Sequence, residues 1–174
     1  MTRLATRLTG ALAALTATAV IAGCASGAAG TSDATLTIVG FAVPEAANKA
    51  LAEEFAATDE GEGLKFRTSY GASGDQSRAV VGGLKADYVH FSVSSDVTRL
   101  VDEGLVAQDW DQGDNRGIVS NSIVVFGVRE GNPKNIRSWN DLTKPGVGIV
   151  TANPASSGAA RWNALAAHGQ VIEN

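Results

Sequence analysis

The stretch LKFRTSYGASGDQSRAVVGGL, residues 64–84, holds the pattern that decides the fold. Apolar and β-branched or aromatic residues alternate with polar ones from Leu64 to Tyr70, which predicts a strand with two distinct faces. The small residues 71–74 form a loop, and residues 75–84 predict a helix that ends near two glycines. One strand–loop–helix unit is therefore expected here.

A similar unit precedes this one. Residues 36–41 predict a strand, and Pro44-Glu45 favours a helix start, because proline suits the first turn and an acid suits the positive end of the helix dipole. The apolar residues of this helix fall at helical spacing, so we expect one face of it to point inward. The residues of that face are Ala47, Ala50, Leu51 and Phe55.

Further units follow. Residues 88–91 predict a strand, and Ser95 or Asp96 is expected to cap the helix after it. The run SIVVFGV at 122–128 predicts the strongest strand of the chain, and 146–150 another, with one helical turn at 138–142 and a helix at 159–168. Alternation of strands and helices predicts an α/β fold with mostly parallel sheets flanked by helices.

The first residues read as a targeting segment. Arg3 and Arg7 precede an uncharged apolar run, Leu8 to Ala22, that is too short for a membrane-spanning helix. It ends in Ile21-Ala22-Gly23-Cys24, which resembles a bacterial lipobox. An ordinary secretory signal with a chance cysteine is the alternative, but Cys24 is the chain's single cysteine. We expect a signal peptide at 1–23, lipidation of Cys24, a flexible tether at 24–34 and attachment to the outer side of the cell membrane.

Composition narrows the classes of function. The 174 residues carry a net charge of −4 with 44% hydrophobic residues, so a basic nucleic-acid surface is not expected. Removal of Arg3 and Arg7 with the signal peptide would change the net charge of the chain from −4 to −4 − 2 = −6. One cysteine allows no disulfide within the chain.

Two loops share one design: a strand, then serine and glycine, then a helix. They are Tyr70 to Gln76 and Asn153 to Ala159. Unpaired N–H groups at a helix start, close backbone approach at glycine and a serine hydroxyl together suit a tetrahedral oxyanion. Taken singly, each loop is better explained by an N-cap serine with glycines for the turn, and it is the presence of two such loops that makes anion binding an equal alternative.

The later half of the chain resembles one known family. Residues 123–134, 139–147, 151–154 and 156–163 are similar to the sulfate- and thiosulfate-binding proteins, the capture components of ABC importers, and residues 71–77 look like the family's first serine loop. The resemblance covers about 36–169. It implies a type II periplasmic-binding-protein-like fold with two lobes, here residues 35–121 and, from the interlobe strand on, 122–174, with the second lobe incomplete.

The resemblance also implies a site. Sulfate or thiosulfate would be held by hydroxyls of Ser73 and Ser157 and by main-chain N–H groups of Gly158, Ala159 and Ala42, without a cationic side chain. The family has Gly-Gly where this chain has Gly158-Ala159, and often an aspartate in place of Ala42. Its other donors, an indole N–H among them, would lie beyond residue 174. An ABC permease is the implied membrane partner, the protein is expected to be a monomer, and no cofactor or nucleic acid is implied.

Other readings remain open. Phosphate or molybdate is the second candidate ligand; a protonated phosphate needs a carboxylate acceptor, and Asp75 is the acid nearest Ser73 in the sequence. A secreted serine hydrolase built on Ser73 or Ser157 is the alternative from another class, although Gly-Ala-Ser-Gly lacks the second glycine of the hydrolase elbow. His90, in a strand, and His168, at a helix end, are expected to be structural or surface residues, not metal ligands. A contact of Arg161 with the anion is an alternative, but Arg161 and Trp162 are expected to brace the last helix.

Overall fold

A three-stranded parallel sheet forms the centre of the fold. The computed structural model describes residues 34–172, all within one compact unit. Strands β1 (Thr35–Phe41), β2 (Lys65–Gly71) and β3 (Tyr88–His90) lie in the order β2-β1-β3. Seven residue pairs join β1 to β2, from Thr35–Lys65 to Phe41–Gly71, and β3 pairs with β1 from Ile38–Tyr88 to Gly40–His90. The predicted α/β alternation is confirmed in this part of the chain.

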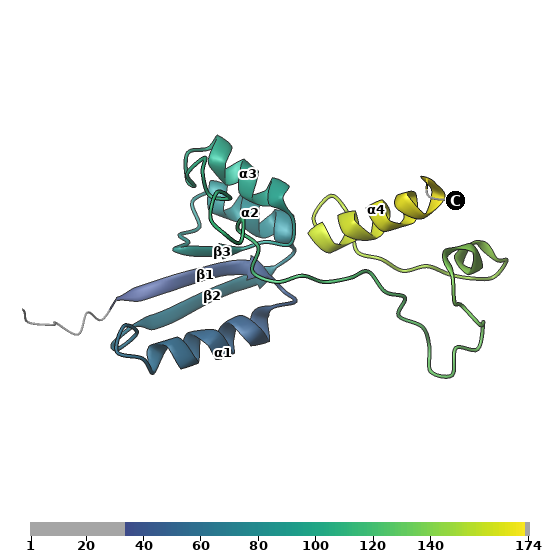
Figure 1. Ribbon diagram of the computed structural model, residues 1–174, viewed down its shortest axis with the longest axis horizontal. Coiled ribbons are helices and arrows are strands. Elements are labelled where there is room, and N and C mark those ends of the chain that lie inside the picture. The colour runs from purple at the N-terminus through teal and green to yellow at the C-terminus, as the bar shows by residue number, and fades with distance from the viewer. Residues whose placement is uncertain (1–33, 173–174) are drawn as a thin grey trace, which may run out of the picture. The chain divides into compact units, whose positions relative to one another are not determined.

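Helices connect the strands. Helix α1 (Glu45–Ala56) joins β1 to β2, α2 (Ser73–Val81) joins β2 to β3, and α3 (Ser94–Asp102) follows β3. The strands lie between α1 on one side and α2 and α3 on the other (Figure 1). Right-handed crossovers produce this arrangement, because the chain moves across the sheet in opposite directions through α1 and α2. A 3-10 helix, η1 (Trp139–Thr143), and helix α4 (Gly158–Ile172) complete the described elements.

The core sits between the sheet and α2 and α3. Val39, Val80 and Leu100 are its buried members, from β1, α2 and α3 respectively. Central strand β1 is buried at Ile38 and Val39, as expected for a parallel strand covered on both faces. Leu100 marks the face of α3 that packs inward.

The orientation predicted for α1 is wrong. Leu51 is 63% and Phe55 42% exposed, and Ala47 and Ala50 are exposed as well. The face that α1 buries carries Asn48, with Ala52 and Ala56 half-buried one and two turns further on. Small side chains on this stripe let the helix approach the sheet closely, whereas the larger apolar stripe lies about one residue away around the helix.

Two predicted strands are not formed. Residues 122–128 and 146–150 belong to no strand of the described structure, and Ile123 is 82% and Val150 99% exposed. A strand is defined by its hydrogen-bonded neighbours, and none lies beside these runs among residues 34–172. The helical turn predicted at 138–142 is confirmed as η1, where Ser138 and Asp141 form a capping box.

Helix ends differ modestly from prediction. α2 begins at Ser73, two residues before the predicted start, and ends at Val81. The two glycines that follow end the helix, and the second, Gly83, has a φ of 104°. α3 begins at Ser94, so Asp96 lies inside it and does not cap it. No helix within residues 34–172 has both the length and the apolar character needed to cross a bilayer. The signal peptide and Cys24 lie outside the described residues.

Candidate anion site at two facing helix starts

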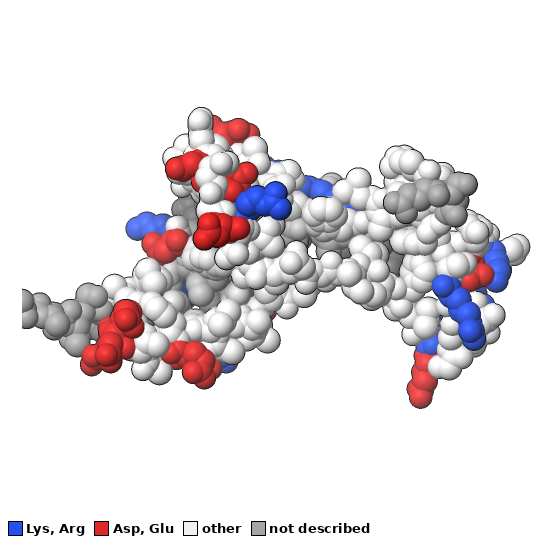
Figure 2. Space-filling view, in the orientation of Figure 1, with Lys and Arg blue, Asp and Glu red and all other residues white. Residues whose placement is uncertain are grey.

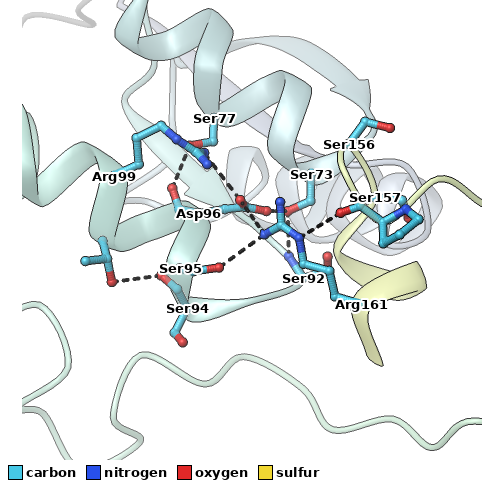
Figure 3. A network of polar contacts seen from close by, with 12 residues as sticks. Ser73, Ser77, Ser92, Ser94, Ser95, Asp96, Arg99, Ser156, Ser157 and Arg161 are labelled. Carbon is cyan, nitrogen blue, oxygen red and sulfur yellow. Dashed lines mark hydrogen bonds and ion pairs between the residues drawn. The ribbon is translucent and has the colours of Figure 1, made fainter. Parts of the chain in front are cut away.

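The carboxyl ends of the three strands meet at one edge of the sheet, because the strands are parallel. The turns that leave this edge carry Ala42 after β1, Ser73 after β2 and Ser92 after β3. Open α/β sheets bind ligands at such an edge. Figure 3 shows the polar network there, with Ser73 and Ser92 beside the loop that precedes α4.

Ser73 is buried, with 2% of its surface exposed. Its hydroxyl donates to Asp96 Oδ2 at 2.7 Å and accepts from the Ser92 N–H at 3.1 Å. A hydroxyl has one proton, so Ser73 has no proton left to donate in this structure. Ser73 would have to break its bond to Asp96 before its hydroxyl could donate to an anion.

Asp96 is the centre of the network and is fully buried. Besides Ser73, its carboxylate accepts from Arg99 Nη1 at 3.3 Å and from Arg161 Nη1 at 3.1 Å. Ser77 donates to the Asp96 carbonyl at 2.6 Å and accepts from Arg99 at 2.7 Å. Paired in this way, the buried carboxylate satisfies the requirement that buried charges be compensated.

The loop before α4 is shaped by Asn153. Its carbonyl accepts from the N–H groups of Ser156 at 3.2 Å and Ser157 at 2.8 Å, and its side chain accepts from the Ala155 N–H at 2.9 Å. This tight turn delivers Ser157 to the N-cap position, where its hydroxyl accepts from the Ala160 N–H at 3.3 Å. The Ser157 proton remains available for an acceptor.

The first N–H groups of α4 lack acceptors. Among residues 34–172, no acceptor meets the N–H of Gly158 or of Ala159. Together with the Ser157 hydroxyl they form a set of three donors at the positive end of a 15-residue helix. This set matches three of the five ligand donors expected from the resemblance.

The two serine loops are in contact. The Gly74 N–H donates to the Ser156 carbonyl at 2.9 Å, and the Trp162 indole donates to the Ser92 carbonyl at 2.8 Å. Arg161 also reaches the Ser95 hydroxyl at 3.2 Å and the Pro154 carbonyl at 3.0 Å. The predicted bracing role of Arg161 and Trp162 is confirmed, and it extends from α4 to the start of α3.

Glycine is required at both points of approach. A Cβ on Gly74 would lie 2.9 Å from the Ser156 carbonyl oxygen, and a Cβ on Gly158 would overlap Ser92 Oγ. The missing side chain lets the start of α2 approach the loop before α4 at Gly74, and lets the start of α4 approach the loop after β3 at Gly158. Gly74 and Gly158, which were expected to serve the turns, therefore also permit these short distances between loops.

The N–H of Ala42, another expected donor, already has an acceptor. Its N–H donates to the Gly71 carbonyl at 3.0 Å, which extends the pairing of β1 and β2 by one residue. That donor is therefore occupied in this structure. The aspartate often found at this position in the family would not alter a bond made by the backbone.

Two candidates for other chemistry are placed elsewhere. Asp75, in the first turn of α2 as predicted, is exposed and pairs with Arg78. His90 is buried against Asn48, with Nδ1 3.2 Å from Oδ1, and burial lowers the pKa of its imidazole. No histidine contact to Ser73 or Ser157 is present among residues 34–172.

Charge and metal chemistry add little at this site. Both arginines of the network are paired with Asp96. Figure 2 shows acidic and basic side chains in separate small groups with uncharged surface between them, and no continuous basic face in that view. Within residues 34–172, no three His, Cys, Asp or Glu side chains gather as metal ligands would.

The sequence did not predict four members of the network, namely Ser77, Ser92, Asp96 and Arg99. Asp96 was assigned to capping, and Ser92 to no role. A signal was present, because Ser92 follows a predicted strand and precedes a predicted helix, as Ser73 does. The third loop at the same sheet edge was therefore predictable from the parallel order of the strands.

Similar proteins are found by sequence and by structure. Residues 36–173 match the family described as bacterial extracellular solute-binding protein. A sulfate-binding protein of Synechococcus elongatus is 47% identical over 142 residues, which cover 79% of this chain and 41% of that protein. A thiosulfate-binding protein of Pseudomonas aeruginosa is 40% identical over 118 residues, which cover 67% of this chain and 36% of that protein.

The solved structure of the sulfate-binding protein SubI from Mycobacterium tuberculosis resembles the present fold with a TM-score of 0.74 and 50% identity. The match covers 76% of this chain and 46% of that one. The chain belongs to the bacterial extracellular solute-binding protein family, and the predicted fold class is confirmed. It spans less than half the length of these relatives.

Proposed function

We propose that the protein captures sulfate or thiosulfate outside the cytoplasm and delivers it to an ABC transporter permease. One observation carries the proposal: the hydroxyl of Ser157 and the N–H groups of Gly158 and Ala159 form an unpaired donor set at the start of α4. That set faces the Ser73 loop across the Gly74–Ser156 contact. The relatives named for sulfate and thiosulfate binding support the same ligand class.

The site is suited to an anion that only accepts hydrogen bonds. Sulfate carries no proton near neutral pH, whereas phosphate keeps one and benefits from a carboxylate acceptor. Asp96 is the buried carboxylate closest to the donors, and its oxygens already accept from Ser73, Arg99 and Arg161. A phosphate proton would have no partner there, and an unpaired buried donor costs binding free energy.

Calorimetry on the full-length protein tests this assignment. Sulfate is expected to bind with little change in affinity between about pH 5 and 8, because no group at the site must change protonation. Phosphate should compete weakly. Molybdate, an unprotonated dianion like sulfate, is compared directly in the same titration. Stronger binding of phosphate than of sulfate would reject the proposal.

Catalysis is not part of this proposal. A serine hydrolase needs a base within hydrogen-bond reach of its nucleophile. The partner of Ser73 is Asp96, already bound to two arginines, and the partner of Ser157 is a backbone N–H. An ester-hydrolysis activity abolished by Ser73→Ala would favour the hydrolase instead.

The proposal includes two lobes and a lipid anchor. Residues 35–121 form the first lobe and 122–174 begin the second, with the ligand held between them. Cys24 carries the lipid that retains the protein, as a monomer, at the outer face of the membrane beside its permease. The lipobox residues Ile21-Ala22-Gly23-Cys24 support the anchor.

Replacement of the lipobox cysteine tests the anchor. Cys24→Ser is expected to abolish incorporation of labelled fatty acid and to release the protein or leave it uncleaved, because the thiol is the acylated group. The Ser157→Ala variant, altered far from the signal, serves as the control and should be labelled normally. Equal labelling of Cys24→Ser and its parent would contradict the assignment.

A further inference from the structure

Ser92 occupies a central position that the proposed site does not yet use. It follows β3 and precedes α3. Its N–H donates to Ser73 Oγ at 3.1 Å, and its carbonyl accepts from the Trp162 indole at 2.8 Å. Both sides of its backbone are therefore held, one by the first serine loop and one by α4. Such a residue presents its side chain in a fixed direction.

The hydroxyl of Ser92 is buried and unpaired. Less than 1 Å² of its oxygen is accessible, and no hydrogen-bond partner lies within reach among the described residues. Buried hydroxyls are almost always paired, because loss of hydration without a new bond is costly. An unpaired one therefore needs a reason.

The hydroxyl lies at the start of α4. A Cβ on Gly158 would overlap Ser92 Oγ and would lie 3.2 Å from Ser92 Cβ and 3.3 Å from Val93 Cγ1. The Gly158 backbone and the Ser92 hydroxyl are thus direct neighbours. The N–H groups without acceptors, those of Gly158 and Ala159, belong to the same helix start.

We infer that the hydroxyl of Ser92 donates a hydrogen bond to the tetrahedral oxyanion bound at the start of α4. The inference rests on the proposed function, since it adds a donor to the same site. An anion that only accepts hydrogen bonds supplies the acceptor that Ser92 lacks. The anion would accept hydrogen bonds from three kinds of donor: the Ser157 hydroxyl, the first N–H groups of α4 and the Ser92 hydroxyl from the loop after β3.

The role of Ser92 differs from that of Ser73. The Ser73 proton is held by Asp96, whereas the Ser92 proton has no acceptor among the described residues. The loop after β2 then positions the loop after β3 through the bond from the Ser92 N–H to Ser73 Oγ. Ser73 becomes a positioning residue for the hydroxyl of Ser92.

Two measurements on Ser92→Ala in the full-length protein test the inference, with sulfate as the probe. By calorimetry, sulfate binding should weaken by about ten- to hundredfold, the effect of one charge-assisted hydrogen bond to a buried anion. Without ligand, the melting temperature should stay the same or rise, because the change removes an unpaired buried group. Ser94→Ala, at an exposed serine two residues further on, is the matched control and should change neither value.

The outcomes separate this inference from the proposed function. If Ser92→Ala bound sulfate as tightly as the parent protein while Ser157→Ala bound it weakly, the inference about Ser92 would be overturned and the proposed function would stand. A fall in the melting temperature of ligand-free Ser92→Ala would also overturn it, because the hydroxyl would then serve the fold. Absence of sulfate binding by the parent protein would overturn the proposed function, and the inference with it.

Discussion

Gly158→Val should remove most of the sulfate affinity of the full-length protein. The valine side chain cannot occupy the space beside Ser92 and Val93, so the start of α4 must move away from the loop after β3. The N–H groups of Gly158 and Ala159 would then miss the anion. Two charge-assisted bonds at about 1.5–3 kcal/mol each amount to about 3–6 kcal/mol, or two to four decades in Kd.

A second glycine of the same helix provides the matched control. Gly169 has open space around it, with no atom within 4 Å of an added Cβ. Gly169→Val should therefore leave sulfate binding unchanged, since valine is at least as good a helix former as glycine. Calorimetric titration of both variants measures the difference. If Gly158→Val bound sulfate like its parent, α4 would not supply the ligand donors.

Asp96→Ala should destabilise the fold strongly. It would leave Arg99, Arg161 and Ser73 without their shared acceptor. Removal of one partner from a buried ion pair costs about 3–5 kcal/mol, and the lower end applies because the arginines are 31% and 28% exposed. We therefore expect the free energy of unfolding, measured by urea denaturation, to fall by about 3 kcal/mol.

Asp75→Ala is the control for this change. Asp75 also pairs with an arginine three residues away, but both side chains of this pair are exposed to solvent. Its loss should cost at most about 1 kcal/mol. Equal destabilisation by the two substitutions would show that the buried network around Asp96 contributes no more than a surface ion pair.

Local patterns predicted the elements that local interactions define. The strand–loop–helix unit at 64–84 formed nearly as expected, because its alternation, glycines and helix start all act within a few residues. The same holds for η1, whose Ser138 and Asp141 cap it locally. Element type was readable wherever neighbouring residues determine it.

Non-local pairing limited the remaining predictions. The run at 122–128 has strong β preference, but preference does not supply a neighbouring strand. Two faces of α1 could have packed against the sheet, one with Asn48, Ala52 and Ala56 and the other with Leu51 and Phe55. The first is the buried one, and which face is buried depends on the surface against which the helix packs. Contacts across the sheet, not spacing along the helix, made that choice.

The candidate site shows the same division. The loop from Asn153 to Ala159 was singled out because it carries a helix start in its own sequence, and the resemblance named Ser157, Gly158 and Ala159 as donors within it. Asp96 and Ser92 were missed because their roles depend on residues 19 to 65 positions away. The Ala42 donor was assigned by position alone, and its bond to Gly71 is a property of the sheet.

The contact between the two serine loops also has a kinetic consequence. The Gly74–Ser156, Arg161–Asp96 and Trp162–Ser92 bonds join α4 and the loop before it to the start of α2, to α3 and to the loop after β3, and this joined side borders the proposed donors at 157–159. An anion passes that side only while these bonds are open. Under the proposed function, an anion leaving on that side would stay bound for a time set by how often these bonds open and not by the speed of diffusion.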